Sequence, residues 1–293
     1  MILSYHPCYE ADTNVLCAGR EPDAADRTAL REAAAVILPQ GCRKALYNMA
    51  RENCSHVFPN YDARFQYPGK TGQARLFEKL GVACPQTWVF QDSEHFIRQR
   101  DRILKAGFPL VLKLDWGGEG DTVFKLKTEA DLQQALDTAA QYERTGQKGF
   151  VIQAYVPHGS RSLRVAVIGK TLISYWRIQE RPSVFGTSVA KGARIDAQSD
   201  PGLRRTAEKR VEDFGRRTGV DLAGIDLIFQ KDGKNKGDPQ PLLLEINYFF
   251  GRTGLGGSER FYTLFQAAVD QWLDRLGLAT RRSDATVFPG EKR

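Results

Sequence analysis

Residues 242–247 read LLLEIN, an apolar run that carries one acidic and one amide side chain. Successive side chains of a β-strand point to opposite faces of the sheet, so Glu245 and Asn247 share one face. A second apolar run, GIDLIF at residues 224–229, is predicted as the neighbouring strand, where Asp226 can face them. Carboxylate and amide oxygens suit a Mg²⁺ ion that bridges phosphates. The alternative is a polar face turned toward water, and the apolar flanks argue against it because Asp and Glu are rarely buried unpaired.

A lysine lies in another apolar strand, upstream of this pair. Residues 109–114 are apolar apart from Lys113, and the turn GGEG follows at 117–120. A buried lysine is costly unless it faces a cleft or an anion, and glycines let backbone N–H groups approach a phosphate closely. A glycine turn between two strands is by itself more often a plain hairpin. The candidate phosphate contacts are Lys113, Gly117, Gly118, Glu119 and Gly120.

Cationic residues stand between these two motifs along the chain. Arg164 and Arg177 lie in predicted strands, and Lys191 lies in a loop that would border the same cleft. Any one of them is more often a surface charge, but as a set they fit stabilisation of a transferring phosphoryl group.

A glycine-rich segment, GRTGLGGS at residues 251–258, leads directly into a predicted helix. Backbone N–H groups and the helix dipole make such an N-terminus a site for an anion. The competing interpretation is a flexible loop in which Ser258 is an ordinary N-cap.

Hydrophobic periodicity and turn residues predict a mixed succession of strands and helices. Gly81 is a typical C-terminal glycine, Asp92 can cap a helix, and Thr128 with Asp131 resembles a capping box. Strands are expected at residues 2–4, 35–39, 57–58, 87–90, 109–114, 122–126, 150–156, 163–168, 172–178, 223–229 and 241–246. Helices are expected at residues 23–34, 43–53, 71–80, 128–142, 201–218 and 258–276.

The composition is that of a globular protein with a buried core, because 42% of the 293 residues are hydrophobic and 26% are charged. No apolar run approaches the roughly 20 residues that a membrane span requires. The N-terminus lacks the basic and apolar regions of a signal peptide, so the expected compartment is the cytoplasm.

The net charge of +7 suits either a nucleic-acid partner or an enzyme that gathers triphosphate and carboxylates. Lysine and arginine are spread along the chain without a nucleic-acid-binding signature, which disfavours the first class. The five cysteines are scattered and lack C-x-x-C spacing, so they indicate neither a zinc site nor a disulfide framework. They are predicted to be free thiols.

Taken in order, these motifs resemble the ATP-grasp superfamily, in particular its glutathione synthetase and ribosomal-protein glutamate ligase branch. The resemblance covers residues 69–276. It begins with Lys70 ahead of a helix and GVACPQT at 81–87, and it continues with the second lysine and its glycine loop. The adenine-binding hinge of the family reads QAYV here, at 153–156, and the strand SLRVAVIG follows at 162–169. No single motif is decisive, but the ordered set is specific.

The resemblance implies an α+β ATP-grasp fold that binds Mg-ATP between two subdomains. It implies an ATP-dependent carboxylate–amine ligase, or carboxylate–thiol ligase, that works through an acyl phosphate. The implied cofactors are ATP and one or two Mg²⁺ ions, with Mn²⁺ as an alternative. The implied partners are small carboxylate and amine substrates such as an amino acid or a peptide, and the family is compatible with a homo-oligomer.

The resemblance also assigns roles to individual residues. The implied ATP contacts are Lys70, Lys113, Gly117, Gly118, Glu119, Gly120, Gln153, Ala154, Tyr155 and Val156. The implied metal ligands are Asp226, Glu245 and Asn247. The implied catalytic residues are Arg164, Arg177 and Lys191, and the implied contacts to a second substrate are Arg252, Gly256 and Gly257.

The expected domains are a short N-terminal α/β unit at 1–68, which resembles a pre-ATP-grasp domain, and an ATP-grasp domain at 69–280. The latter would divide into a smaller nucleotide-clasping subdomain at about 85–156 and a larger metal-binding subdomain at about 157–280. Residues 281–293 would form a flexible tail.

Two positions depart from the family pattern. Ala154 replaces the usual hinge glutamate, so the adenine amino group would rely on backbone carbonyls near Gln153 and Tyr155. Ser162 replaces the usual aspartate before Arg164. A kinase that phosphorylates a hydroxyl would use the same lysines, loop and metal ligands, so it stays an alternative. A nucleotide-binding regulator without turnover is a further alternative, which the intact metal ligands disfavour.

Overall fold

The computed structural model describes residues 1–118, 120–230 and 239–278, and these divide into two compact units. Unit 1 comprises residues 1–61 and 168–171 with the described residues from Leu255, and unit 2 comprises residues 62–167 and 172–254. The domain limits expected from the sequence stay predictions, and the expected tail at 281–293 lies outside the described residues.

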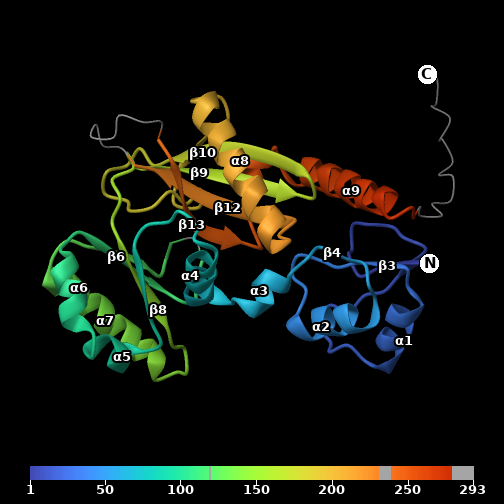
Figure 1. The fold of residues 1–293 in the computed structure, drawn as a ribbon, viewed down its shortest axis with the longest axis horizontal. Coiled ribbons are helices and arrows are strands. Elements are labelled where there is room, and N and C mark those ends of the chain that lie inside the picture. The colour runs from blue at the N-terminus through green and yellow to red at the C-terminus, as the bar shows by residue number, and fades with distance from the viewer. Residues whose placement is uncertain (119, 231–238, 279–293) are drawn as a thin grey trace, which may run out of the picture. The chain divides into compact units, whose positions relative to one another are not determined.

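Unit 1 contains a parallel sheet with the strand order β2-β1-β3-β4; its strands β3 and β4 are labelled in Figure 1. Its buried strands are apolar except for Ser4, as expected when both faces are covered. The strands are β1 (Ile2–Ser4), β2 (Thr13–Asn14), β3 (Ala35–Ile37) and β4 (Val57–Phe58). The helices are α1 (Ala24–Glu32), α2 (Lys44–Asn53) and α9 (Ser258–Arg275), the last after the 3-10 helix η1 (Thr253–Leu255).

Helix α9 brings aromatic side chains into the core of unit 1. His6 stacks on Phe265 with ring centroids 4.2 Å apart, and the Tyr9 hydroxyl donates to Asp270 at 2.8 Å. The first residues of the chain and helix α9 therefore fold into one unit.

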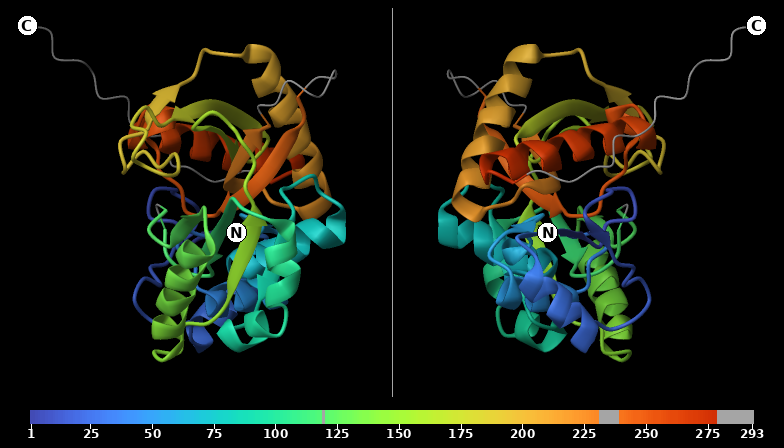
Figure 2. Two further views of the ribbon diagram at one scale, coloured as in Figure 1. Left: turned by 90° about the vertical axis from the view of Figure 1, so that its left-hand side faces the viewer. Right: turned by 90° about the vertical axis from the view of Figure 1, so that its right-hand side faces the viewer.

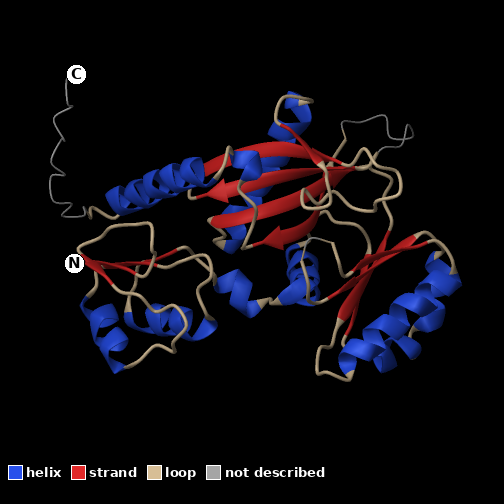
Figure 3. Cartoon of the chain, turned by 180° about the vertical axis from the view of Figure 1, so that it is seen from behind, coloured by secondary structure: helices blue, strands red, loops and turns tan. Residues whose placement is uncertain are grey.

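The first sheet of unit 2 is antiparallel, with the strand order β5-β8-β6-β7. Its helices cover one face (Figure 3), and the expected caps Asp92 and Thr128 start two of them. The strands are β5 (Thr87–Phe90), β6 (Leu110–Leu114), β7 (Val123–Leu126) and β8 (Phe150–Ala154). The helices are α5 (Ser93–Ile97), α6 (Arg100–Ala106) and α7 (Glu129–Glu143).

The second sheet of unit 2 has the strand order β11-β10-β9-β12-β13. Helix α8 runs along it (Figure 2) and buries Ala207, Val211 and Phe214 in the same core as Val165 and Ile225. The strands are β9 (Arg161–Ile168), β10 (Thr171–Ile178), β11 (Arg194–Asp196), β12 (Leu222–Phe229) and β13 (Pro241–Asn247). The helices are α3 (Asp62–Gln66), α4 (Gly69–Leu80) and α8 (Pro201–Thr218).

The elements expected from periodicity are present within a few residues of their predicted ends. The short elements β2, α3, α6, β11 and η1 were not predicted, because each is too short to show a period. Helix α4 ends at Gly81 in the left-handed conformation, as expected. The cysteines are free. No helix among the described residues is both long and apolar enough to cross a membrane.

Candidate functional site

Unit 2 contains a cavity of about 580 Å³, a size typical of a small-molecule site. Strands β6 and β8 line one side, and strands β9, β10, β12 and β13 line the other. The lining includes most of the residues that the sequence singled out: Lys113, Gly118, Gly120, Gln153, Ala154, Tyr155, Val156, Arg164, Arg177, Asp226, Glu245 and Asn247.

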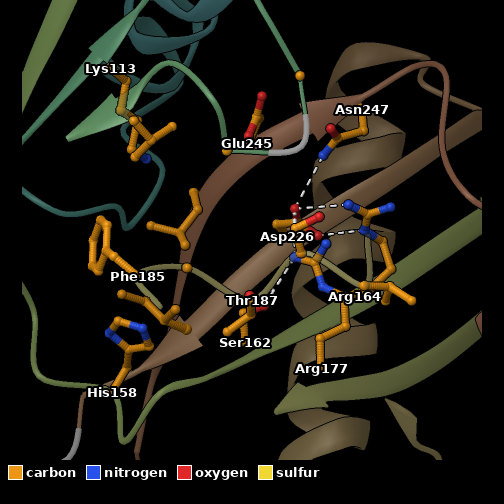
Figure 4. Close-up of a pocket in the computed structure, with 18 of the residues that line it drawn as sticks. Lys113, His158, Ser162, Arg164, Arg177, Phe185, Thr187, Asp226, Glu245 and Asn247 are labelled. Carbon is orange, nitrogen blue, oxygen red and sulfur yellow. Dashed lines mark hydrogen bonds and ion pairs between the residues drawn. The ribbon is translucent and has the colours of Figure 1, made fainter. Parts of the chain in front are cut away.

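Asp226 lies at the centre of an ion-pair cluster in this cavity (Figure 4). Its carboxylate accepts hydrogen bonds from Nε of Arg164 and, at 2.9 Å, from Nη2 of Arg164. It pairs with Arg177 Nη2 at 2.8 Å. The amide nitrogen of Asn247 donates to Asp226 Oδ2 at 3.2 Å and to the carbonyl of Gly224 at 3.3 Å. The oxygens of Asp226 are therefore largely committed to the protein's own donors.

The cluster keeps its members ionised. Burial opposes the charged form of Asp226, but the guanidinium groups of Arg164 and Arg177 outweigh it and lower the pKa of the carboxyl. Burial also opposes the charged form of Arg164, yet Asp226 raises the pKa of that guanidinium. Tyr175 lines the same cavity, and burial raises the pKa of its hydroxyl, which stays protonated at neutral pH.

Arg177 retains unused hydrogen-bonding capacity. Its Nη2 donates to Ser162 Oγ at 3.0 Å, and Ser162 Oγ lies 2.5 Å from Thr187 Oγ1. Its Nε is buried and has no hydrogen-bond partner in the part of the chain that the structure describes. A buried N–H without an acceptor is costly, so this edge of the guanidinium is available to an anionic ligand.

Two lysines lie near Glu245: Lys113 lines the cavity, and Lys70 lines a smaller pocket that shares Lys113 and Glu245. Lys70 Nζ lies 3.5 Å from Glu245 Oε1, and the Glu245 side chain keeps 30% of its surface exposed. Burial lowers the pKa of the Lys113 ammonium; Glu245 opposes this shift and Lys70 adds to it. Lys113 makes no ion pair within 4.0 Å among the described residues, so its charge is available to a ligand.

The glycine loop is held in a conformation that favours glycine. Gly117 has φ of +84°, and a Cβ there would lie 2.6 Å from Thr122 Cγ2. Gly120 has φ of +80°, and a Cβ there would lie 3.7 Å from Lys191 Nζ. Lys191 pairs with Asp121 at 2.8 Å, so this predicted catalytic lysine lies beside the loop. Glu119 lies outside the described residues.

Comparison with known proteins identifies the family of this fold. Residues 69–259 match the family model described as a RimK-like ATP-grasp domain. The chain belongs to the RimK-like ATP-grasp family. A RimK-domain ATP-grasp protein from Sphaerobacter thermophilus superimposes with a TM-score of 0.61 at 14% identity, covering 91% of this chain and 98% of that one. The D-alanine–D-alanine ligase of Bacillus anthracis complexed with ATP gives a TM-score of 0.59 at 14% identity, covering 85% and 82%.

One curated relative aligns with only part of this chain. An uncharacterised MG012 homologue from Mycoplasma pneumoniae is 26% identical over 150 residues, which are 50% of this chain. The match spans 46% of that relative, so the chain aligns with about half of its length. The family assignment therefore rests on the ATP-grasp domain.

The hinge predicted for this ATP-grasp domain, residues 153–156, also lines the cavity. Gln153 donates from Nε2 to Thr87 Oγ1 at 2.9 Å, and the Lys125 ammonium lies 3.9 Å from the centre of the Tyr155 ring. His158 also lines the cavity, with Nδ1 2.8 Å from the carbonyl of Val156. Burial lowers the pKa of His158, and nothing in its sequence context had singled it out.

The predicted metal ligands form a suitable donor set. Glu245 and Asn247 line the cavity from one strand, and Asp226 lies opposite Glu245 in the β12–β13 register. The amide nitrogen of Asn247 is turned to Asp226 and Gly224, which leaves its Oδ1 for another partner. Oxygen donors of this kind fit Mg²⁺. Asp226 can join this set only while its oxygens also serve the two arginines.

The predicted second-substrate residues are not gathered in the same way. The cavity wall includes Gly251, Thr253 and Gly254, but Arg252 does not belong to the described lining. Gly256 and Gly257 have φ of +90° and +100° and belong to unit 1. Gly257 is the N-cap of α9 and Ser258 its first residue, so Ser258 is not the N-cap. The role of these residues stays a prediction.

Proposed function

We propose that this protein is an ATP-dependent ligase that joins a carboxylate to an amine through an acyl phosphate. The observation that carries the proposal is the charge of the cavity. Lys113, Arg164 and Arg177 line the cavity with only two carboxylates, Asp226 and Glu245. Lys70, in a small pocket that shares Lys113 and Glu245, adds a fourth cation beside Glu245. Such an excess suits a polyanion, because a desolvated cation is stable only beside an anion.

The family assignment supports ATP as that polyanion. The D-alanine–D-alanine ligase of similar fold was crystallised with ATP, and its name describes a ligase that joins two amino acids. By this likeness an amino acid or a peptide is the proposed substrate class.

The proposed roles follow from the contacts at each end of the cavity. The hinge at 153–156 would hold the adenine, and Lys70 and Lys113 would bind the phosphates under the glycine loop. Arg177 has a free Nε edge and would stabilise the transferring phosphoryl group, together with Lys191 beside the loop.

In the first step, an oxygen of the substrate carboxylate, oriented by Arg164, attacks the γ-phosphorus and ADP leaves. In the second step, the amine attacks the carbonyl carbon of the acyl phosphate, phosphate leaves, and the amine loses a proton. Exclusion of water by the glycine loop would protect the acyl phosphate from hydrolysis.

One or two Mg²⁺ ions, or Mn²⁺, would be held by Glu245 and Asn247 with Asp226, and would offset the negative charge of the phosphates. Arg252, Gly256 and Gly257 are proposed to contact the second substrate. These roles rest on the resemblance and on the donor set described above.

The test is Mg²⁺-dependent phosphate release from ATP with a panel of amino acids and small dicarboxylates, supplied singly and in pairs. Release that needs both a carboxylate and an amine supports the ligase. The Glu245→Gln variant should lose this release, while Glu180→Gln, which removes an exposed carboxylate paired with Arg194, should retain it. A stable phosphoester product would show a kinase instead of a ligase. ATP binding without turnover under any pairing of substrates would show a nucleotide-binding regulator.

A further inference from the structure

The side chain of Gln73, on helix α4, makes two hydrogen bonds to the backbone of one residue in β13. Its Nε2 donates to the carbonyl of Ile246 at 2.8 Å, and its Oε1 accepts from the Ile246 N–H at 2.8 Å. Ile246 stands between the proposed metal ligands Glu245 and Asn247. The side-chain amide of Gln73 therefore holds the backbone between the two proposed metal ligands of β13 through two hydrogen bonds.

Gln73 can form these hydrogen bonds because β13 is the last strand of its sheet. One side of β13 pairs with β12, where Asp226 is opposite Glu245. The other side would present unpaired backbone groups, which buried structure does not tolerate. Ile246 is 2% exposed, so water cannot replace a lost partner there. The primary amide of Gln73 offers one donor and one acceptor, as a neighbouring strand would.

Helix α4 also contributes a charged side chain, Lys70, near Glu245. Lys70 is the second residue of α4, about one turn before Gln73, and its Nζ lies 3.5 Å from Glu245 Oε1. The N-terminus of α4 is held in turn by Asp115, which accepts from the Thr71 N–H at 2.7 Å. Phosphate-binding and metal-binding groups are thus joined through a single helix.

We propose that Gln73 is a positioning residue for the metal site: its two hydrogen bonds to Ile246 hold Glu245 and Asn247 in place relative to Lys70 and Asp226. The proposal rests on the proposed Mg-nucleotide site. Outer groups that orient metal ligands typically contribute 10–100-fold to metal affinity or activity. Loss of the two hydrogen bonds should therefore weaken metal binding more than nucleotide binding.

The test is Gln73→Met, which keeps the length of the side chain and its helix propensity but removes both hydrogen-bonding groups. Mn²⁺ binding to the full chain is measured by electron paramagnetic resonance in the presence of saturating ADP, and metal-free ADP binding is measured by calorimetry. We expect Mn²⁺ affinity to fall about tenfold or more and metal-free ADP affinity to change less than about threefold. Hydrogen exchange of the Ile246 amide should accelerate in the same variant.

The control for a general loss of stability is Ile103→Val, at a buried residue of α6 that does not line the cavity and belongs to another hydrophobic cluster than Ile246. It should lower the melting temperature and leave Mn²⁺ affinity unchanged. If Gln73→Met and Ile103→Val lower the Mn²⁺ affinity equally, Gln73 serves only the fold and the proposal is wrong. If the unaltered protein binds Mn²⁺ no better with ADP than without, the proposed function fails first and the role of Gln73 fails with it.

Discussion

Replacement of Asp226 by asparagine is the sharpest test of the ion-pair cluster. The substitution preserves shape but removes the charge that compensates Arg164 and Arg177, and it turns an N–H₂ group toward donors that need an acceptor. Asp226 is 6% exposed. Removing one partner of a buried pair costs about 3–5 kcal/mol because the remaining charge is left uncompensated. We expect the free energy of unfolding of unit 2 to fall by about that amount.

The assay is urea denaturation followed by tryptophan fluorescence, with Asp213→Asn as the matched control. Asp213 pairs with Arg216 at 2.9 Å on the exposed side of α8, where such a pair is worth about 1 kcal/mol or less. The second arm combines Asp226→Asn with Arg177→Met. Since the double variant no longer buries an unmatched Arg177, its loss should be smaller than the sum of the single losses by about 0.5–3 kcal/mol. Equal losses for Asp226→Asn and Asp213→Asn, or strict additivity, would refute the reasoning.

Three further outcomes are expected. Lys113→Met should weaken ATP binding about 10–100-fold, since a hydrogen bond from a charged group is worth about 1.5–3 kcal/mol; calorimetry that shows less than a twofold change would count against a phosphate contact. The pKa of Asp226 is lower in the folded protein than in the unfolded chain. Its contribution to stability is therefore present above the unfolded pKa of about 3.9 and is lost as the pH falls through the folded pKa. Urea denaturation below about pH 4 should show a loss of stability in the original protein that Asp226→Asn lacks. Gly117→Ala should weaken ATP binding by about tenfold, because φ is +84° and the new Cβ would meet Thr122. The control Gly202→Ala, in α8, has open space around the new Cβ and lies outside the cavity lining, so it should bind ATP normally.

Much of the site could be predicted from local sequence. Strand alternation put Glu245 and Asn247 on one face, and both line the cavity with Asp226 in register opposite Glu245. The position of Lys113 in an apolar strand likewise predicted a cation in a cleft. These predictions hold because the period of a strand depends only on neighbouring residues.

The partners of the charged groups could not be predicted in this way. Arg164 and Arg177 were predicted as catalytic cations of the cleft, but their contacts to Asp226 were not foreseen, because only the assembled sheet brings the three residues together. The hydrogen bonds between Gln73 and Ile246 join residues 173 positions apart, and no periodic pattern in the sequence indicates them. His158 was missed for the same reason, because its place in the cavity wall depends on the fold of β8 and the segment after it.

The covered edge of β13 has a consequence for the behaviour of the chain in concentrated solution. An outer strand with open backbone groups can recruit a strand from another molecule, and this is a route to aggregation. Along β13, Leu243 donates to the carbonyl of Ala83 at 2.9 Å, and Gln73 occupies both groups of Ile246. The segment that runs from α4 to β5 therefore covers the edge of β13 and prevents it from pairing with a strand of another molecule. Variants in which this segment is less well packed should become less soluble before they unfold.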